Sequence, residues 1–193
     1  MNLQRFGELM TAQDKGLCQW ISEWRAFLEF AQAYFAARSV LHPVVVEIGI
    51  ASNSQKVFYL EFLGAEHIGI DINYQISVYG APAQPDIVGD SHDPGTVEAL
   101  KSRLAGRSID LLFIDGDHAY DSVKLDYELY GPLTKHLIAI HDIHTDQWDE
   151  EVPAINVKRF WKGLTAIESK NTLLEIRSFG RQGIGVVIKD GGA

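Results

Sequence analysis

Short apolar runs alternate with amphipathic stretches from residue 43 onward. Runs that are apolar throughout are typical of strands buried on both faces, and apolar positions three and four apart predict helices between them. Strands are expected at Val44–Ile48, Ile68–Asp71, Asp86–Val88, Ile109–Ile114 and Leu137–Ile140. Helices are expected at Ser54–Leu63, ended by Gly64, between the cap Asp93 and Gly106, and at Asp121–Tyr130.

The two ends of the chain add further elements. An aromatic stripe predicts a helix at Leu17–Arg38 with Asp14 as its cap, and the stripe packs in the core or covers a substrate or second subunit. Loops are expected at Asn73–Pro85 and at the acidic segment Thr145–Glu151. A short helix around Trp161 then precedes two strands joined by a glycine-containing link, Leu173–Arg177 and Ile184–Lys189, which suits an antiparallel hairpin.

This order predicts an α/β fold. We expect a doubly wound, mostly parallel, seven-stranded sheet with a C-terminal antiparallel hairpin and an added N-terminal helix. With no repeat or linker visible, residues 1–193 are expected to form one domain, in which 1–42 are a helical extension and 43–190 are the ligand-binding core.

Composition narrows the class of protein. The formal net charge is −9 with no basic cluster, which argues against a nucleic-acid partner. No apolar run has membrane length, and the first ten residues lack the apolar core of a signal peptide. The single cysteine, Cys18, excludes an internal disulfide and a cysteine-based zinc site, so a cytoplasmic protein is expected. The sequence is compatible with a homo-oligomer.

Polar residues follow four of the expected strands, at Glu47–Gly49, Asp71, Asp90–Ser91 and Asp115–His118. Because the carboxyl ends of parallel strands share one edge of the sheet, these groups should converge on a ligand. An acid such as Asp71 at the end of the second strand can bind ribose hydroxyls. The first turn lacks the second glycine of a pyrophosphate-binding loop, which favours an adenosine ligand without phosphates over a dinucleotide.

Several of these motifs resemble a known family, the class I S-adenosylmethionine-dependent methyltransferases. The matching segments are Val46–Gly49, Gly69–Asp71 and Asp90–Ser91. The segment Phe113–Tyr120, followed later by His141–Ile143, resembles more specifically the branch with macrocin-type and cephalosporin-pathway O-methyltransferases. The resemblance runs from Val44 to Lys189 and implies a Rossmann-like methyltransferase fold.

The resemblance also implies site residues. By position, the cofactor S-adenosylmethionine would contact Glu47, Gly49, Asn53, Asp71, Asp90, Ser91 and Asp115. Asn53 stands where the family usually has glycine, and asparagine tolerates the left-handed backbone that such a turn needs.

The reaction expected from this resemblance is O-methylation of a small hydroxylated acceptor, such as a sugar, a phenol or a secondary metabolite. His118 is the expected general base beside Asp115, with a pKa somewhat above the free value because Asp115 and Asp117 adjoin it. Asp115, His141 and Asp142 are candidate ligands for Mg²⁺ or Mn²⁺. Two alternatives remain, a nucleotide-dependent oxidoreductase or epimerase on a Rossmann sheet, and a non-catalytic adenosyl-ligand-binding domain.

Overall fold

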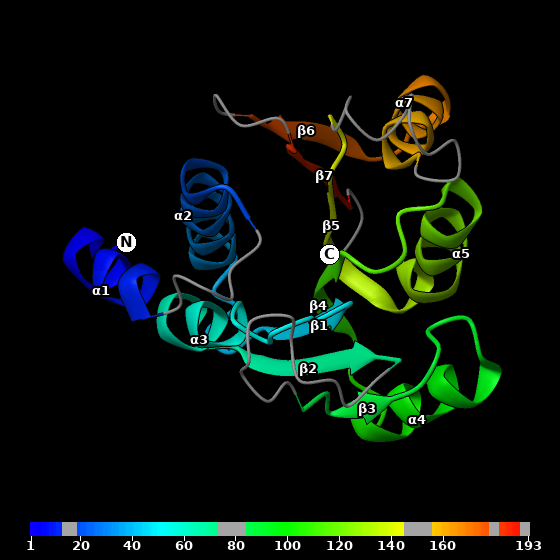
Figure 1. Ribbon diagram of the computed structural model, residues 1–193, viewed down its shortest axis with the longest axis horizontal. Helices are drawn as coiled ribbons and strands as arrows, with labels where there is room; N and C mark the ends of the chain where they lie inside the picture. Colours follow the sequence, from blue (N-terminus) through cyan, green and yellow to red (C-terminus); the bar gives the residue numbers. More distant parts are fainter. Residues whose placement is uncertain (13–18, 73–83, 145–155, 178–181, 190–193) are drawn as a thin grey trace.

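The computed structural model describes residues 1–12, 19–72, 84–144, 156–177 and 182–189 (Figure 1). Three expectations fall outside these residues: the cap Asp14, all but the last two residues of the loop Asn73–Pro85, and the acidic segment Thr145–Glu151.

Within the described residues, seven strands form one sheet in the order β3-β2-β1-β4-β5-β7-β6. All neighbouring strands are parallel except where β7 pairs antiparallel with both β5 and β6. The predicted mostly parallel sheet with a C-terminal hairpin is therefore confirmed. The strands are β1 (Val44–Ile48), β2 (Glu66–Asp71), β3 (Ile87–Val88), β4 (Ile109–Ile114), β5 (Thr134–His141), β6 (Thr172–Ile176) and β7 (Ile184–Ile188).

Helices cover both faces of the sheet, as Figure 1 shows: α1, α2 and α3 on one side, and α4, α5 and α7 on the other. Two apolar clusters result, one containing Trp24, Phe27 and Phe113, and the other containing Trp161 and Ile114. Burial on both faces explains why β1 and β4 are apolar almost throughout. The helical elements are α1 (Leu3–Ala12), α2 (Ile21–Ala37), α3 (Lys56–Phe58), η1 (Tyr59–Leu63), α4 (Pro94–Leu104), α5 (Tyr120–Tyr130), η2 (Gly131–Leu133) and α7 (Val157–Ile167).

The N-terminal extension differs from the prediction. Helix α1 was not predicted, and its buried Phe6 packs on Phe58 of α3 with ring centroids 5.6 Å apart. Helix α2 begins at Ile21 rather than Leu17, and Trp20 is its N-cap. The aromatic stripe mainly fills the core, since Trp24 is fully buried, whereas Trp20 is 51% exposed.

Other helices and strands can also be compared with the prediction. The helix expected at Ser54–Leu63 is a turn of α3 continued by the π-helix η1, and Gly64 ends it in a left-handed conformation, as predicted. Strand β5 begins at Thr134, three residues earlier than its apolar run, because Thr134 pairs with Ile109 of β4. Asp93 caps α4 by accepting a hydrogen bond of 2.7 Å from the Gly95 N–H, which confirms that prediction. No helix of the described ranges combines the length and the apolarity needed to cross a membrane.

Candidate active site

A cavity of about 500 Å³ opens at the carboxyl edge of the sheet. Its wall is formed by the residues that follow β1, β2, β3 and β4, so the expected convergence of the strand ends is observed. Of the residues predicted to bind the cofactor or a metal or to act in catalysis, six line this cavity: Gly49, Asp71, Asp90, Ser91, Asp115 and His118.

The turn after β1 passes close to the end of β4. Gly49 has a φ of +80°, and a Cβ atom there would lie 2.6 Å from Cα of Gly116 and closer still to the carbonyl oxygen of Asp115. Its N–H donates to the carbonyl oxygen of Ile70 at 2.9 Å, which ties the turn to β2 as well. Only glycine fits this position, and the bare backbone leaves room for a ligand.

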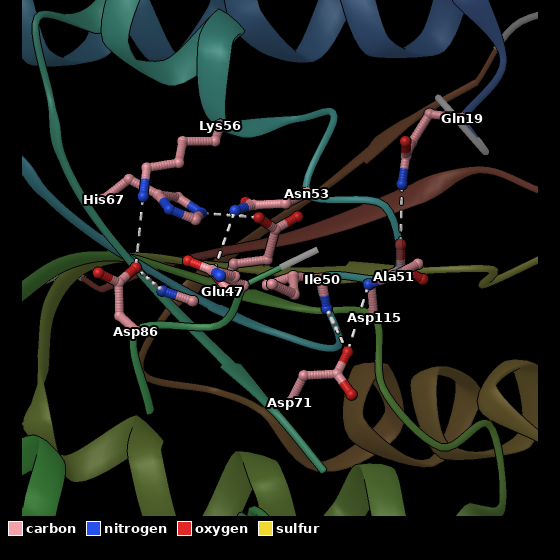
Figure 2. Close-up of polar contacts among 12 residues, drawn as sticks. Gln19, Glu47, Ile50, Ala51, Asn53, Lys56, His67, Asp71, Asp86 and Asp115 are labelled. Atoms are coloured by element: carbon pink, nitrogen blue, oxygen red, sulfur yellow. Dashed lines mark hydrogen bonds and ion pairs between the residues drawn. The ribbon is translucent and has the colours of Figure 1, made fainter. Parts of the chain in front are cut away.

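Asp71 supports this turn from the end of β2. Its Oδ2 atom accepts hydrogen bonds from the N–H groups of Ile50 at 3.0 Å and Ala51 at 3.3 Å (Figure 2). Asn53 takes a φ of +57°, so the left-handed backbone expected of it is observed. Its side chain is directed at the carbonyl oxygen of Gln84, 3.5 Å away, and does not line the cavity.

Glu47 lies behind the turn rather than on the cavity wall. It is fully buried and shares the sheet face of Val45, beneath α2 and α3. Its Oε2 atom lies 2.7 Å from Nε2 of His67 (Figure 2). The ring of His67 also stacks on Tyr59. Burial raises the pKa of Glu47 against the opposing effect of His67.

The cavity wall beyond β3 contains residues that the sequence analysis did not single out. His92 follows Asp90 and Ser91 on the cavity wall, and Ile72, which follows β2, and Ser122 of α5 line the cavity as well. Nε2 of His92 lies 3.3 Å from Oδ1 of Asp126, which is 1% exposed. Burial raises the pKa of Asp126 to about 6. In the sequence, the signal for His92 was its position next to Asp90–Ser91. No local pattern indicated that Asp126 would contact His92.

Two carboxylates and two imidazoles meet at the ends of β4 and β5. Oδ1 of Asp115 lies 3.0 Å from Nδ1 of His141. Nε2 of His118 lies 3.0 Å from Oδ2 of Asp142 and 3.7 Å from Oδ1 of Asp115. Two of the predicted metal ligands, Asp115 and Asp142, therefore lie close together at the ends of neighbouring strands.

The charges of this cluster shift the pKa values of its members. Asp115 and Asp142 together raise the pKa of His118 to about 10. Although burial opposes it, the carboxylate of Asp115 also holds the pKa of His141 well above its usual value. The pKa of Asp115 is lowered, since His141 and His118 outweigh the effect of its burial.

The expectation of a modest shift for His118 was wrong. Its second carboxylate is Asp142 from β5, whereas Asp117 accepts a hydrogen bond of 2.6 Å from the hydroxyl of Ser122. In this arrangement His118 carries a proton at pH 7.

The same cluster has the donor set of a metal site. Across the described residues, Asp115, His118 and Asp142 each offer one ligand atom, and these atoms lie within 4.8 Å of one another. The predicted set contained His141 instead of His118. Nδ1 of His141 also approaches both carboxylates, at 3.0 and 3.4 Å. A set of one imidazole and two carboxylates suits Mn²⁺ better than Mg²⁺, because Mg²⁺ prefers a shell made only of oxygen ligands.

Comparisons with known proteins agree with this geometry. A family model described as a methyltransferase domain matches residues 60–143. No curated protein sequence matches the chain.

Solved structures share the fold at low sequence identity. The MycE methyltransferase from the mycinamycin biosynthetic pathway, in complex with Mg, SAH and mycinamycin VI, is 17% identical with a TM-score of 0.62, covering 95% of this chain and 54% of MycE. The chain thus spans about half the length of MycE. The O-methyltransferase TomG from Streptomyces achromogenes, involved in tomaymycin synthesis and in complex with SAM, is 13% identical with a TM-score of 0.63, covering 98% of this chain and 89% of TomG.

An O-methyltransferase from Bacillus cereus in complex with SAH is 12% identical, with a TM-score of 0.54, and the match covers 97% of this chain and 90% of that protein. The sheet order, the covering helices and these matches give the same result. The chain has the Rossmann-like fold of O-methyltransferases, and its residues 60–143 match a methyltransferase domain family.

Proposed function

We propose that this protein is an S-adenosylmethionine-dependent methyltransferase that methylates a hydroxyl oxygen of a small molecule. The observation that carries the proposal is the single cavity at which the Gly49 turn, Asp71 and the Asp115–His118 segment converge. When bound, the cofactor supplies an electrophilic methyl group. The protein has to orient the acceptor oxygen and take up its proton.

The cavity has the size and lining of an adenosyl site. Its volume of about 500 Å³ lies within the usual range for small-molecule pockets. Asp71 presents a carboxylate for ribose hydroxyls, and the neighbouring Ile72 adds an apolar surface for a purine ring. We assign Gly49, Asp90, Ser91 and Asp115 to the same ligand, with Glu47 and Asn53 acting through the shape of the turn.

His118 is the proposed general base on the acceptor side. As the hydroxyl oxygen forms its bond to the methyl group, its proton would pass to Nδ1 of the His118 imidazole, because Nε2 faces the carboxylates of Asp115 and Asp142. The ring must be neutral for this step, and a cation held by the two carboxylates would favour that form by offsetting their charge. The carboxylates of Asp115 and Asp142 orient the ring from one side. His118 is 37% exposed in its side chain, so an acceptor in the cavity can reach it, whereas His141 is almost fully buried.

We further propose that Asp115, His141 and Asp142 can hold a divalent cation, with Mn²⁺ the better fit. The distances between their ligand atoms support this set. A nitrogen that binds a cation cannot also accept the acceptor's proton, so the base role of His118 goes together with His141 as the nitrogen ligand.

The proposal also includes the family branch, the kind of acceptor and the cellular location. The segment Phe113–Tyr120 and the pair His141–Asp142 support membership of the macrocin-type and cephalosporin-pathway branch. The net charge of −9 supports a small-molecule acceptor rather than a nucleic acid, and the single cysteine supports cytoplasmic residence.

Calorimetry with S-adenosylhomocysteine and with NAD tests the cofactor assignment. The protein should bind S-adenosylhomocysteine, and Asp71→Ala should weaken that binding by about 1.5–3 kcal/mol, the scale of hydrogen bonds to a charged group. Asp93→Ala is the matched control, because Asp93 also accepts a backbone hydrogen bond but lies off the cavity wall. Tight NAD binding without S-adenosylhomocysteine binding would overturn the proposal. Turnover with a panel of hydroxylated acceptors then separates an enzyme from a non-catalytic domain.

A further inference from the structure

Gln19 links the N-terminal extension to the site. It lies just before α2, is 5% exposed, and its Nε2 atom donates a hydrogen bond of 2.8 Å to Oδ2 of Asp115, which is 96 residues away in the chain (Figure 2). The packing of α2 on the sheet positions this contact. Trp24 in the first turn of α2 is fully buried and packs on Phe113 of β4, with ring centroids 5.8 Å apart.

The amide of Gln19 has a defined orientation. An ionised carboxylate can only accept hydrogen bonds, so the amide nitrogen must face Asp115 and the carbonyl oxygen must face away from it. That Oε1 atom is buried and has no hydrogen-bond partner among the described residues. A buried acceptor without a partner costs free energy, and an apolar side chain of the same size would avoid that cost.

Gln19 places this oxygen next to an anion of the cavity wall, the carboxylate of Asp115. Oε1 of Glu47 is likewise buried without a partner in the described part of the chain. Besides their burial, the negative charge of Asp115 raises the pKa values of Glu47 and Tyr59, so the field of this carboxylate reaches their side of the sheet although His118 and His141 also contact it. A cationic hydrogen-bond donor is the ligand group that such a region favours.

We infer that Gln19 is a ligand-binding residue of this site. Its amide nitrogen fixes the carboxylate of Asp115, and its carbonyl oxygen accepts a hydrogen bond from the ammonium group at the amino-acid end of the bound cofactor. The inference rests on the proposed function and adds to it a contact from outside the methyltransferase motifs.

Calorimetry of Gln19→Met with two ligands tests this assignment. Methionine keeps the length of the side chain and removes both polar atoms. S-adenosylhomocysteine should bind about ten- to a hundredfold more weakly to the variant, as expected for a lost hydrogen bond to a charged group. Binding of 5′-methylthioadenosine, which has no amino-acid end, should change little.

Gln32→Met is the matched control. Gln32 lies on α2, and its Nε2 atom donates a 2.7 Å hydrogen bond to the carbonyl oxygen of Phe62, away from the cavity. This variant should bind both ligands as the wild type does. Urea denaturation checks that each variant is folded, and Gln19→Leu takes the place of Gln19→Met should methionine disturb folding.

Three results would overturn the inference. The first is wild-type affinity of Gln19→Met for S-adenosylhomocysteine, in which case Oε1 is paired by water. The second is an equal loss for both ligands, which would mean that Gln19 supports the whole cavity. The third is a wild-type protein that binds neither ligand, a result that removes the proposed function and this inference together.

Discussion

Replacing Gly49 by alanine tests whether the turn after β1 shapes the site. Gly49 has a φ of +80°, and the added Cβ would lie 2.6 Å from Cα of Gly116 and closer to the carbonyl oxygen of Asp115. Both neighbours are backbone atoms of the segment that follows β4. No side-chain rotation can therefore relieve the contact, and the turn or the end of β4 has to move.

The expected cost follows from these two effects. A left-handed backbone is unfavourable for alanine by roughly 1 kcal/mol, and overpacking in a well-packed region costs about 1–3 kcal/mol. The free energy of unfolding should therefore fall by about 2–4 kcal/mol. The Gly49 turn also lines the cavity, and a misplacement of about 1 Å at a site can cost on the order of a hundredfold in function, so S-adenosylhomocysteine affinity should fall as well.

Urea denaturation and calorimetry measure the two quantities. Gly163→Ala in α7 is the control, because nothing lies within 4 Å of a Cβ at that position and its backbone is helical. It should raise stability by up to about 1 kcal/mol and leave ligand binding unchanged. If Gly49→Ala instead matched the wild type in both stability and S-adenosylhomocysteine affinity, the close approach of the turn to β4 would be wrong.

Three further predictions concern the cluster and the cavity wall. His118→Ala should lower turnover by roughly 10²–10⁴-fold with little change in S-adenosylhomocysteine affinity, and unchanged turnover would exclude His118 as the base. Mn²⁺ should raise the melting temperature of the wild type but not of Asp142→Asn, because a cation that binds only the folded state stabilises it; equal wild-type values in EDTA and Mn²⁺ would count against the metal site. Asp126 has a pKa of about 6 in the folded protein against the ordinary 3.8, so the folded state holds the extra proton between these values. Wild-type stability relative to Asp126→Asn should therefore fall as the pH rises from 4 to 6, by up to about 3 kcal/mol, and a pH-independent difference would contradict the raised pKa.

The fold class was predictable from local patterns. Strands buried on both faces require apolar runs, and such runs marked β1 and β4 correctly. Parallel strands share their carboxyl edge, so the polar residues that follow them had to meet there, and Gly49, Asp71 and Asp115 do line one cavity. Asp93 at the start of α4 was also correctly identified, since a cap depends only on residues within one turn.

Strand boundaries and the N-terminal helix were less predictable. Thr134 belongs to β5 only because it pairs with Ile109, and its polarity hid that from the sequence. Helix α1 is short, and its place depends on the contact of Phe6 with Phe58. Both features are determined by partners that lie far away in the chain.

The sequence by itself determined the alternation of strands and helices, the edge that carries the site and most of the residues that gather there, because these follow from local periodicity and sheet geometry. Only the tertiary structure decided which side chains pair. It directed Glu47 to His67 instead of the cavity, gave His118 its second carboxylate from Asp142, and brought Gln19 to Asp115. These contacts depend on strand register, side-chain direction and the packing of α2 on β4, which no local pattern encodes.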